Sequence, residues 1–166
     1  DSQDKNLAGV IDRNLEIPLD TGKIICLIGV RRSGKTHVLY SIISKLRKTV
    51  DPSNIVYINF EDDRLFPLEL KDFNTLLDAY YELYPNKKNE KVYFFFDEIQ
   101  NVQNWEKFIR RLYDTENCSI FLTGSSAKLL SREIATALRG RTLSYEVFPL
   151  SFSEYLRFKG IKTDGH

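Results

Sequence analysis

A nearly continuous apolar run, Lys23 to Ile28 (KIICLI), leads directly into a glycine-containing loop, and this junction constrains the fold more than any other feature of the chain. Continuous apolar sequence is typical of a parallel strand that is buried on both faces. After the loop, Thr36 to Arg47 places apolar residues at intervals of three and four, which predicts an amphipathic helix. The junction therefore predicts a strand, loop and helix unit inside an α/β fold.

The same alternation of apolar or β-branched runs with helical periods continues along the chain. Further strands are predicted at residues 55–60, 91–96, 119–122 and 142–148, and further helices at residues 72–84, 105–113 and 131–138. This alternation is the pattern of a parallel sheet that is covered by helices on both faces. We therefore expect a doubly wound, three-layer α/β domain with a five-stranded, mainly parallel sheet. Ser151 and Glu154, three residues apart, predict a capping box at the start of one more helix.

Two of the predicted helices carry clear apolar stripes. In the helix at 72–84, the stripe consists of Phe73, Leu76, Leu77, Tyr80 and Tyr84. In the helix at 105–113, the residues expected to face inward are Trp105, Phe108, Ile109 and Leu112. Such stripes are more often core packing than platforms for stacked bases.

The composition is that of one globular domain, with 166 residues, 42% of them hydrophobic and 28% charged. The 24 basic and 23 acidic residues nearly cancel, so no strong overall field draws this segment to nucleic acid or to an acidic membrane. No apolar run approaches the roughly 18 residues of a membrane span. Cys26 and Cys118 lack metal-ligand spacing and are expected to be reduced core residues. We therefore expect a cytoplasmic segment that contacts no membrane. The sequence does not support direct nucleic-acid binding by this segment, and a local basic patch stays open as an alternative.

The domain is expected over residues 23–160, after a polar lead-in at residues 1–22 and before a tail at residues 161–166. The sequence has no methionine, which suggests a processed, trimmed or engineered start. The polar end has no obvious stop. We expect the chain to be a fragment of a longer protein, truncated in the tail.

The loop after the first strand fits the phosphate-binding pattern G-x-x-x-x-G-K-[ST] with Gly29, Val30, Arg31, Arg32, Ser33, Gly34, Lys35 and Thr36. Glycines permit a tight turn whose backbone amides point at phosphates, and the helix that begins here adds its positive dipole end. Lys35 is expected to reach the β- and γ-phosphates, and Thr36 to bind Mg²⁺ through its hydroxyl. His37 is included in the nucleotide-binding segment. The competing interpretation is a glycine turn with a solvated lysine.

The strand at 91–96 ends in two acids, Asp97 and Glu98. Because the carboxyl ends of parallel strands face the ligand crevice, Asp97 is expected beside the phosphates. Asp97 is predicted to hold Mg²⁺, directly or through water, and Glu98 to orient or deprotonate the attacking water. An acid after an apolar strand is a weak signal by itself. Together with the phosphate loop, the pair predicts nucleotide hydrolysis.

Two further candidates lie near strand ends. Ser125 is a candidate to contact the γ-phosphate or the attacking water, and an equally good alternative is that it belongs to a turn that caps the next helix. Arg139 and Arg141 precede the strand at 142–148. Either is a candidate to stabilise transition-state charge in a neighbouring subunit, and the alternative is a solvated helix end where arginine complements the dipole.

The chain resembles the AAA-like archaeal and bacterial ATPases of the AAA_14 type in four blocks, namely GVRRSGKT, FDEIQNVQNWE, LTGSSAKLLS, and LRGR followed by FPLSFSEY. The resemblance covers about Gly29 to Tyr155. It implies a three-layer P-loop NTPase domain that uses ATP and Mg²⁺. The loop itself reads phosphates, so the choice of ATP over GTP rests on this resemblance.

Each block of the resemblance implies a role. The first block is the Walker A loop, with Lys35 and Thr36. The second is the Walker B strand, with Asp97 and the catalytic glutamate Glu98. The resemblance thus agrees with the roles that the residues themselves indicate.

The last two blocks are less specific about single residues. The third implies a sensor at the end of its strand, which matches Ser125 or Ser126. The G-R pair of the fourth matches Gly140 and Arg141, which favours Arg141 over Arg139.

The family typically continues into a C-terminal region, a part that is absent from this chain. Our leading hypothesis is therefore a Mg²⁺-dependent ATPase domain that acts as a motor or switch for an unseen C-terminal domain or partner. A homo-oligomer that supplies an arginine in trans is a candidate partner. One alternative is a nucleotide-dependent regulatory module with little turnover. A second is a small-molecule kinase, which would need an acceptor pocket that the sequence does not reveal.

Overall fold

The sheet of this computed structural model contains five strands, all of them parallel, in the order β2-β3-β4-β1-β5. The structure describes residues 15–125, 127–150, 156 and 159. The strands are β1 (Ile24–Ile28), β2 (Ile55–Asn59), β3 (Val92–Asp97), β4 (Cys118–Gly124) and β5 (Thr142–Glu146). The helices are α2 (Lys35–Leu46), α3 (Leu70–Leu83), α4 (Trp105–Thr115) and α5 (Ala127–Ala137).

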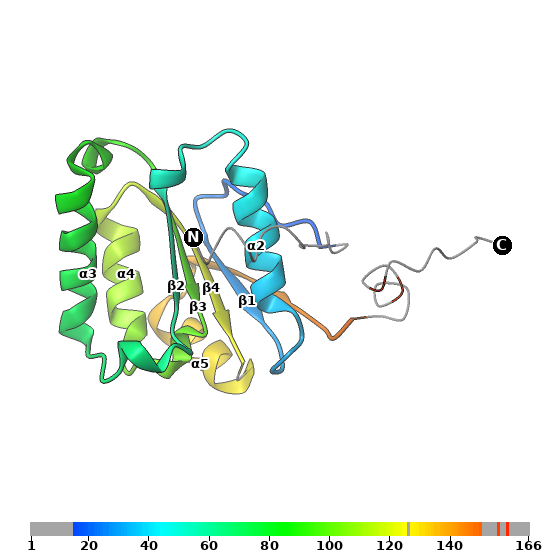
Figure 1. The fold of residues 1–166 in the computed structure, drawn as a ribbon. Coiled ribbons are helices and arrows are strands. Elements are labelled where there is room, and N and C mark those ends of the chain that lie inside the picture. The colour runs from blue at the N-terminus through cyan, green and yellow to red at the C-terminus, as the bar shows by residue number, and fades with distance from the viewer. Residues whose placement is uncertain (1–14, 126, 151–155, 157–158, 160–166) are drawn as a thin grey trace.

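Helices cover both faces of the sheet, with α2 on one side and α3 and α4 on the other (Figure 1). The residues of β1 alternate between two cores. Ile24, Cys26 and Ile28 pack with side chains of α3, α4 and α5, whereas Ile25 and Leu27 pack with side chains of α2. Because β1 is buried on both faces, all five of its residues are apolar. The three-layer α/β fold is therefore confirmed, with a wholly parallel sheet.

Most predicted elements shift by only a few residues at their ends. The largest shift is in α5, which begins at Ala127 instead of residue 131. The strand β5 ends at Glu146, two residues earlier than predicted, and its pairing explains why. It lies at the edge of the sheet and pairs with β1 over Ile24 to Ile28, so the ladder stops where β1 turns into its loop.

The stripe predicted on α3 is wrong at its last position. Phe73 is buried and Tyr80 is partly buried, but Tyr84 is 43% exposed. Because the helix ends at Leu83, Tyr84 leaves the helical period. Tyr81 is buried instead, and its hydroxyl donates a hydrogen bond to Glu116 Oε2 at 2.9 Å. The inward stripe of α4 is confirmed at all four positions.

Both cysteines are free thiols, Cys26 buried and Cys118 partly buried. Burial raises the pKa of each to about 12, so both stay protonated at neutral pH. None of the helices in the described ranges is both long and apolar enough to cross a membrane. The capping box predicted at Ser151 and Glu154 lies outside the described residues.

The strand order decides which loops meet. The strand β4 lies between β1 and β3, with Ile28 paired to Gly124 and Phe96 paired to Leu122. The segments that follow β1, β3 and β4 therefore leave the sheet side by side at its carboxyl edge. This edge is where ligands bind in open parallel sheets.

Candidate active site

The loop between β1 and α2 is tightly folded. A Cβ added at Gly29 would lie 2.3 Å from the carbonyl oxygen of Val147 and 2.8 Å from Ser33 Oγ, so no larger residue fits without movement. Gly34 has φ 96° and lies directly before the first residue of α2. Arg32 also has a positive φ, 62°. The turn therefore places the start of α2, with its free amides, at the edge of the sheet.

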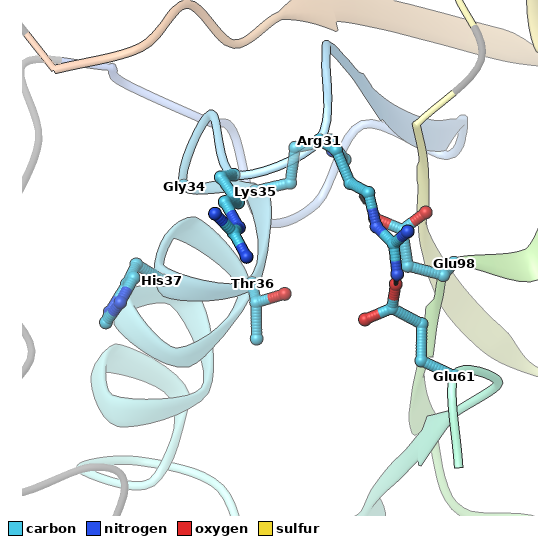
Figure 2. A pocket seen from close by; sticks show the side chains of 8 residues that line it. Arg31, Gly34, Lys35, Thr36, His37, Glu61 and Glu98 are labelled. Carbon is cyan, nitrogen blue, oxygen red and sulfur yellow. Dashed lines mark hydrogen bonds and ion pairs between the residues drawn. The ribbon is translucent and has the colours of Figure 1, made fainter. Parts of the chain in front are cut away.

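Lys35, the first residue of α2, is 3% exposed. Its Nζ donates hydrogen bonds to the carbonyl oxygens of Gly29 at 3.1 Å and Val30 at 3.0 Å. The same Nζ lies 3.3 Å from Glu98 Oε1 (Figure 2). The buried charge is thus balanced by an acid from another strand end and held inside the loop.

Thr36 and Asp97 form the second contact between the loop and β3. Thr36 Oγ1 donates a hydrogen bond to Asp97 Oδ2 at 2.8 Å, and Asp97 is 1% exposed. A hydroxyl and a carboxylate side by side offer only oxygen ligands, which are the ligands that Mg²⁺ prefers. The donor set therefore fits the metal that the sequence predicts.

Asp97 has two further hydroxyl partners. Tyr57 donates to Oδ2 at 2.9 Å, and Thr123 donates to Oδ1. Burial, and then the negative charge of Asp97, raise the pKa of Tyr57 well above its ordinary value, so the phenol keeps its proton. The hydroxyl of Tyr40 donates in turn to that of Tyr57 at 3.3 Å. Asp97 is therefore held by α2, β2 and β4 together.

Sequence reasoning assigned no role to Tyr57 or to Thr123. Tyr57 pairs with Phe95, two positions before Asp97, so alternation places Tyr57 and Asp97 on the same face of neighbouring strands. This relation follows from the strand order, which one sequence does not contain. The signal in the sequence was the hydroxyl-bearing Tyr57 in the middle of the otherwise apolar run of β2.

Glu98 follows β3 in a left-handed backbone conformation, with φ 54° and ψ 47°. Such a conformation is uncommon for a residue other than glycine, and it clusters at functional sites. Glu98 is 6% exposed. Its Oε2 accepts hydrogen bonds from Gln100 Nε2, at 2.6 Å, and from Ser125 Oγ. The backbone conformation and the side chains of Gln100, Ser125 and Lys35 thus hold the Glu98 carboxylate beside the loop.

The protonation of Glu98 follows from these partners. Burial raises the pKa of the Glu98 carboxyl. The hydrogen bonds from Ser125 and Gln100, together with the charge of Lys35, outweigh burial and bring that pKa below its ordinary value. Glu98 is therefore ionised at neutral pH and can accept a proton.

A pocket of about 590 Å³, a size typical of small-molecule sites, lies at the phosphate loop. The pocket is lined by Arg31, Arg32, Gly34, Lys35, Thr36, His37, Glu61 and Glu98. Arg31 and Glu61 point toward one another at one side, with Arg31 Nη2 3.0 Å from Glu61 Oε1, and His37 lies on the other side (Figure 2). A second hollow, of about 510 Å³, shares Arg31 and Glu61 and is also lined by Gln100 and Ser125. Glu98 lines the first pocket, and its partners Gln100 and Ser125 line the second.

The structure brings most of the predicted site residues together and separates one. Lys35, Thr36, Asp97, Glu98 and Ser125 meet at the carboxyl edge of the sheet through the contacts above. Of the predicted loop residues, Val30 is 58% exposed although its carbonyl oxygen contacts Lys35. Ser126, the other predicted sensor, lies outside the described residues.

Arg141 lies at the opposite edge. Its carbonyl oxygen accepts a hydrogen bond from the amide of Ile24, the first residue of β1, whereas the pocket begins beyond Ile28, the last. A five-residue strand spans about 16 Å, so Arg141 does not reach the pocket of its own chain. Its Nε donates a hydrogen bond to Asp114 Oδ1 at 3.2 Å. The predicted role in a neighbouring subunit stays a prediction.

Comparison with known proteins identifies relatives over most of the chain. A protein of Methanocaldococcus jannaschii named Uncharacterized protein MJ1544 is 51% identical over 152 residues, which cover 92% of this chain and 32% of the relative. An uncharacterized protein of Haemophilus influenzae is 40% identical over 144 residues, which cover 86% of this chain and 35% of the relative. The chain thus spans about a third of the length of the curated relatives it matches.

A solved structure with a similar fold is that of C. elegans PCH-2, with a TM-score of 0.53 and 16% sequence identity. The match covers 80% of this chain and 37% of that chain. The model of the AAA_14 family, described as an AAA domain, matches residues 21–156. Since this match includes the sheet and every residue of the site described above, the protein belongs to the AAA_14 family of AAA domains.

Proposed function

We propose that the chain is a P-loop ATPase domain that binds ATP with Mg²⁺ and hydrolyses the bond between the β- and γ-phosphates. The observation that carries the proposal is the Glu98 carboxylate, held 3.3 Å from Lys35 in the pocket that Thr36 also lines, while Asp97 accepts a hydrogen bond from Thr36. Membership of the AAA_14 family supports ATP as the bound nucleotide. The acid at the pocket supports hydrolysis over binding alone.

The loop and α2 would bind the phosphates. Lys35 Nζ is held by two carbonyl oxygens and by Glu98. Phosphate oxygens carry more negative charge than carbonyl oxygens, so the ammonium would turn to the β- and γ-phosphates when ATP enters. This movement would also release Glu98 Oε1 from its partner. Phosphate binding and the freeing of the base are thus one event.

Thr36 and Asp97 would hold Mg²⁺, which neutralises charge on the phosphate oxygens when bound. Glu98 would accept the proton of the attacking water, whose oxygen bonds to the γ-phosphorus while the bridging oxygen leaves with ADP. Gln100 and Ser125 keep the carboxylate oriented by donating to Oε2. Metal binding, proton transfer and orientation of the base would therefore fall to different residues.

The domain would work as part of a larger assembly. The curated relatives are about three times as long as the matched segment, so we propose that hydrolysis acts as a motor or switch for a further domain or a protein partner. Arg141 of a second copy would supply positive charge at the γ-phosphate. Arg141 lies away from the nucleotide pocket of its own chain, which supports a contact with the γ-phosphate bound by a second copy.

The test is an assay of inorganic phosphate released from ATP and from GTP, with and without Mg²⁺, beside a binding measurement. Phosphate release that requires Mg²⁺ and is lost in Lys35→Ala together with binding is the expected result. Binding without release would favour the regulatory module instead. Transfer of phosphate to an added acceptor would favour a kinase. Failure of the wild-type chain to bind either nucleotide would refute all three.

A further inference from the structure

Thr123 lies between the two acids of the site and is fully buried, with 0% exposure. It belongs to β4, the strand between β1 and β3, and pairs with Leu27. Leu27 packs with α2, and so does Phe121, two positions before Thr123. Strand alternation therefore turns the Thr123 side chain to the α2 side of the sheet, where Asp97 also lies.

The hydroxyl of Thr123 contacts both acids at once. It donates its proton to Asp97 Oδ1 and accepts the backbone amide of Glu98 at 2.8 Å. A hydroxyl has one proton, a carboxylate oxygen accepts and an amide donates, so the direction of both bonds is fixed. One oxygen atom thus links the position of the Asp97 side chain to the position of the Glu98 backbone.

The backbone at Glu98 shows what this link does. Successive residues of a strand point to opposite faces, so a Glu98 that continued β3 would point away from Asp97 and from Lys35. The left-handed turn, with φ 54°, instead brings Glu98 Oε1 to 3.3 Å from Lys35 Nζ. The hydrogen bond from the Glu98 amide to Thr123 fixes the peptide plane from which this turn starts, and with it the position of the Glu98 Cα.

We propose that Thr123 is a positioning residue that sets the metal-binding carboxylate and the catalytic base relative to each other through one hydroxyl. The chemical roles of the two acids rest on the proposed function, but the coupling of their positions rests on the contacts above. Thr123 does not line the pocket described above. Its effect on the reaction passes through Asp97 and Glu98.

The alternative is that Thr123 only fills space in the core, and two substitutions separate the roles. Thr123→Val keeps the shape and removes the hydroxyl, which leaves Asp97 Oδ1 and the Glu98 amide each short of a partner. Thr123→Ser keeps the hydroxyl and removes a methyl group. A packing role predicts that the serine variant is the more damaged one, whereas the positioning role predicts the reverse.

The first measurement uses no nucleotide. Hydrogen exchange of the Glu98 amide, followed by NMR, should be slow in the wild-type chain and in Thr123→Ser, and faster in Thr123→Val because its acceptor is gone. Thr136→Val is a matched control, since the Thr136 hydroxyl bonds to carbonyl oxygens within α5 and contacts neither acid. Equal exchange of the Glu98 amide in the valine and serine variants would overturn the proposal, whether or not the chain hydrolyses ATP.

The second measurement follows ATP binding with and without Mg²⁺, and phosphate release. For Thr123→Val we expect unchanged Mg²⁺-free binding, a loss of the extra affinity that Mg²⁺ gives, and turnover lowered by about 100-fold, the scale of a displaced general base. Thr123→Ser should keep both the extra affinity that Mg²⁺ gives and the turnover near their wild-type values. Wild-type turnover in Thr123→Val, or an equal loss in Thr123→Ser, contradicts the proposal.

Two controls distinguish failure of the proposed ATPase function from failure of the proposed role of Thr123. If the wild-type chain itself neither binds nor hydrolyses ATP, the proposed function fails, and the amide exchange still tests Thr123. If thermal melting shows that Thr123→Val does not fold, Thr123→Cys replaces it, because a thiol is a weak donor and acceptor. The cysteine variant should lose part of the Mg²⁺-dependent affinity and part of the turnover, and wild-type values for both would count against the positioning role.

Discussion

At the scale of single residues, the site is organised around two carboxylates with different partners. Asp97 receives hydroxyl donors from Thr36, Tyr57 and Thr123. Glu98 receives an ammonium, an amide and a hydroxyl. The first set suits a carboxylate that shares a metal with Thr36. The second suits a carboxylate that must stay ionised to take a proton.

Ser125 tests the orientation of Glu98. Its hydroxyl donates to Glu98 Oε2, and a hydrogen bond to a charged group contributes roughly 1.5–3 kcal/mol. We expect Ser125→Ala to lower kcat about tenfold or more, with ATP affinity unchanged, in a phosphate-release assay. A Ser125→Ala variant that loses ATP affinity and keeps kcat would instead assign Ser125 to nucleotide binding.

Tyr57 tests the orientation of Asp97. Outer partners of metal ligands typically change metal affinity by about 10–100-fold when removed. We therefore expect Tyr57→Phe to weaken the Mg²⁺ dependence of ATP binding by about tenfold. Tyr40→Phe is the control, since the Tyr40 hydroxyl contacts Tyr57 and not Asp97. Equal Mg²⁺ titrations for wild type and Tyr57→Phe would show that Tyr57 is dispensable.

At the scale of elements, the loop, the helix α2 and the acid-bearing strand were predictable because each has a local signature. The glycine spacing, the period of three and four, and the apolar run before Asp97 are all contained in short stretches of sequence. Thr123 and Tyr57 acquire their roles from cross-strand neighbours that are 26 and 40 residues from Asp97. Such pairings depend on strand order, and local pattern does not determine it.

The loop also has a packing requirement that the motif alone does not explain. A Cβ at Gly29 would lie 2.3 Å from the carbonyl oxygen of Val147, a rigid backbone atom. We expect Gly29→Ala to lower the free energy of unfolding by about 1–3 kcal/mol, as in other overpacked sites, in denaturant titrations. Gly22→Ala is the comparison, because Gly22 has a positive φ but no atom within 4 Å of the place that an added methyl group would take. A larger loss in Gly22→Ala than in Gly29→Ala would contradict this account.

At the scale of the whole molecule, one chain holds the phosphate loop and both acids but keeps Arg141 at the far edge of its sheet. The sequence placed Arg141 in a motif, yet it did not reveal on which edge the residue lies, since that depends on the pairing of β5 with β1. In this structure Arg141 pairs with the half-exposed Asp114. A surface pair of this kind contributes little stability, so the arginine is available to a second copy at small cost.

Assembly is therefore expected to control turnover. Specific activity should rise with protein concentration, and Arg141→Ala should lower kcat by about 10³-fold or more, the scale of an arginine supplied in trans. Asp114→Asn weakens the same ion pair and keeps the arginine, so it should retain wild-type activity. Mixing Glu98→Gln with Arg141→Ala should recover part of the activity, because each variant supplies what the other lacks. Specific activity independent of concentration, with no recovery on mixing, would argue against the second copy.

The central claim is that Glu98 takes the proton of the attacking water while the loop binds the phosphates. The most direct measurement compares Glu98→Gln with wild type for ATP affinity in Mg²⁺ and for single-turnover phosphate release. We predict similar affinity and release slowed by about 100-fold or more, because the amide cannot accept the proton. Release by Glu98→Gln at the wild-type rate would contradict the account.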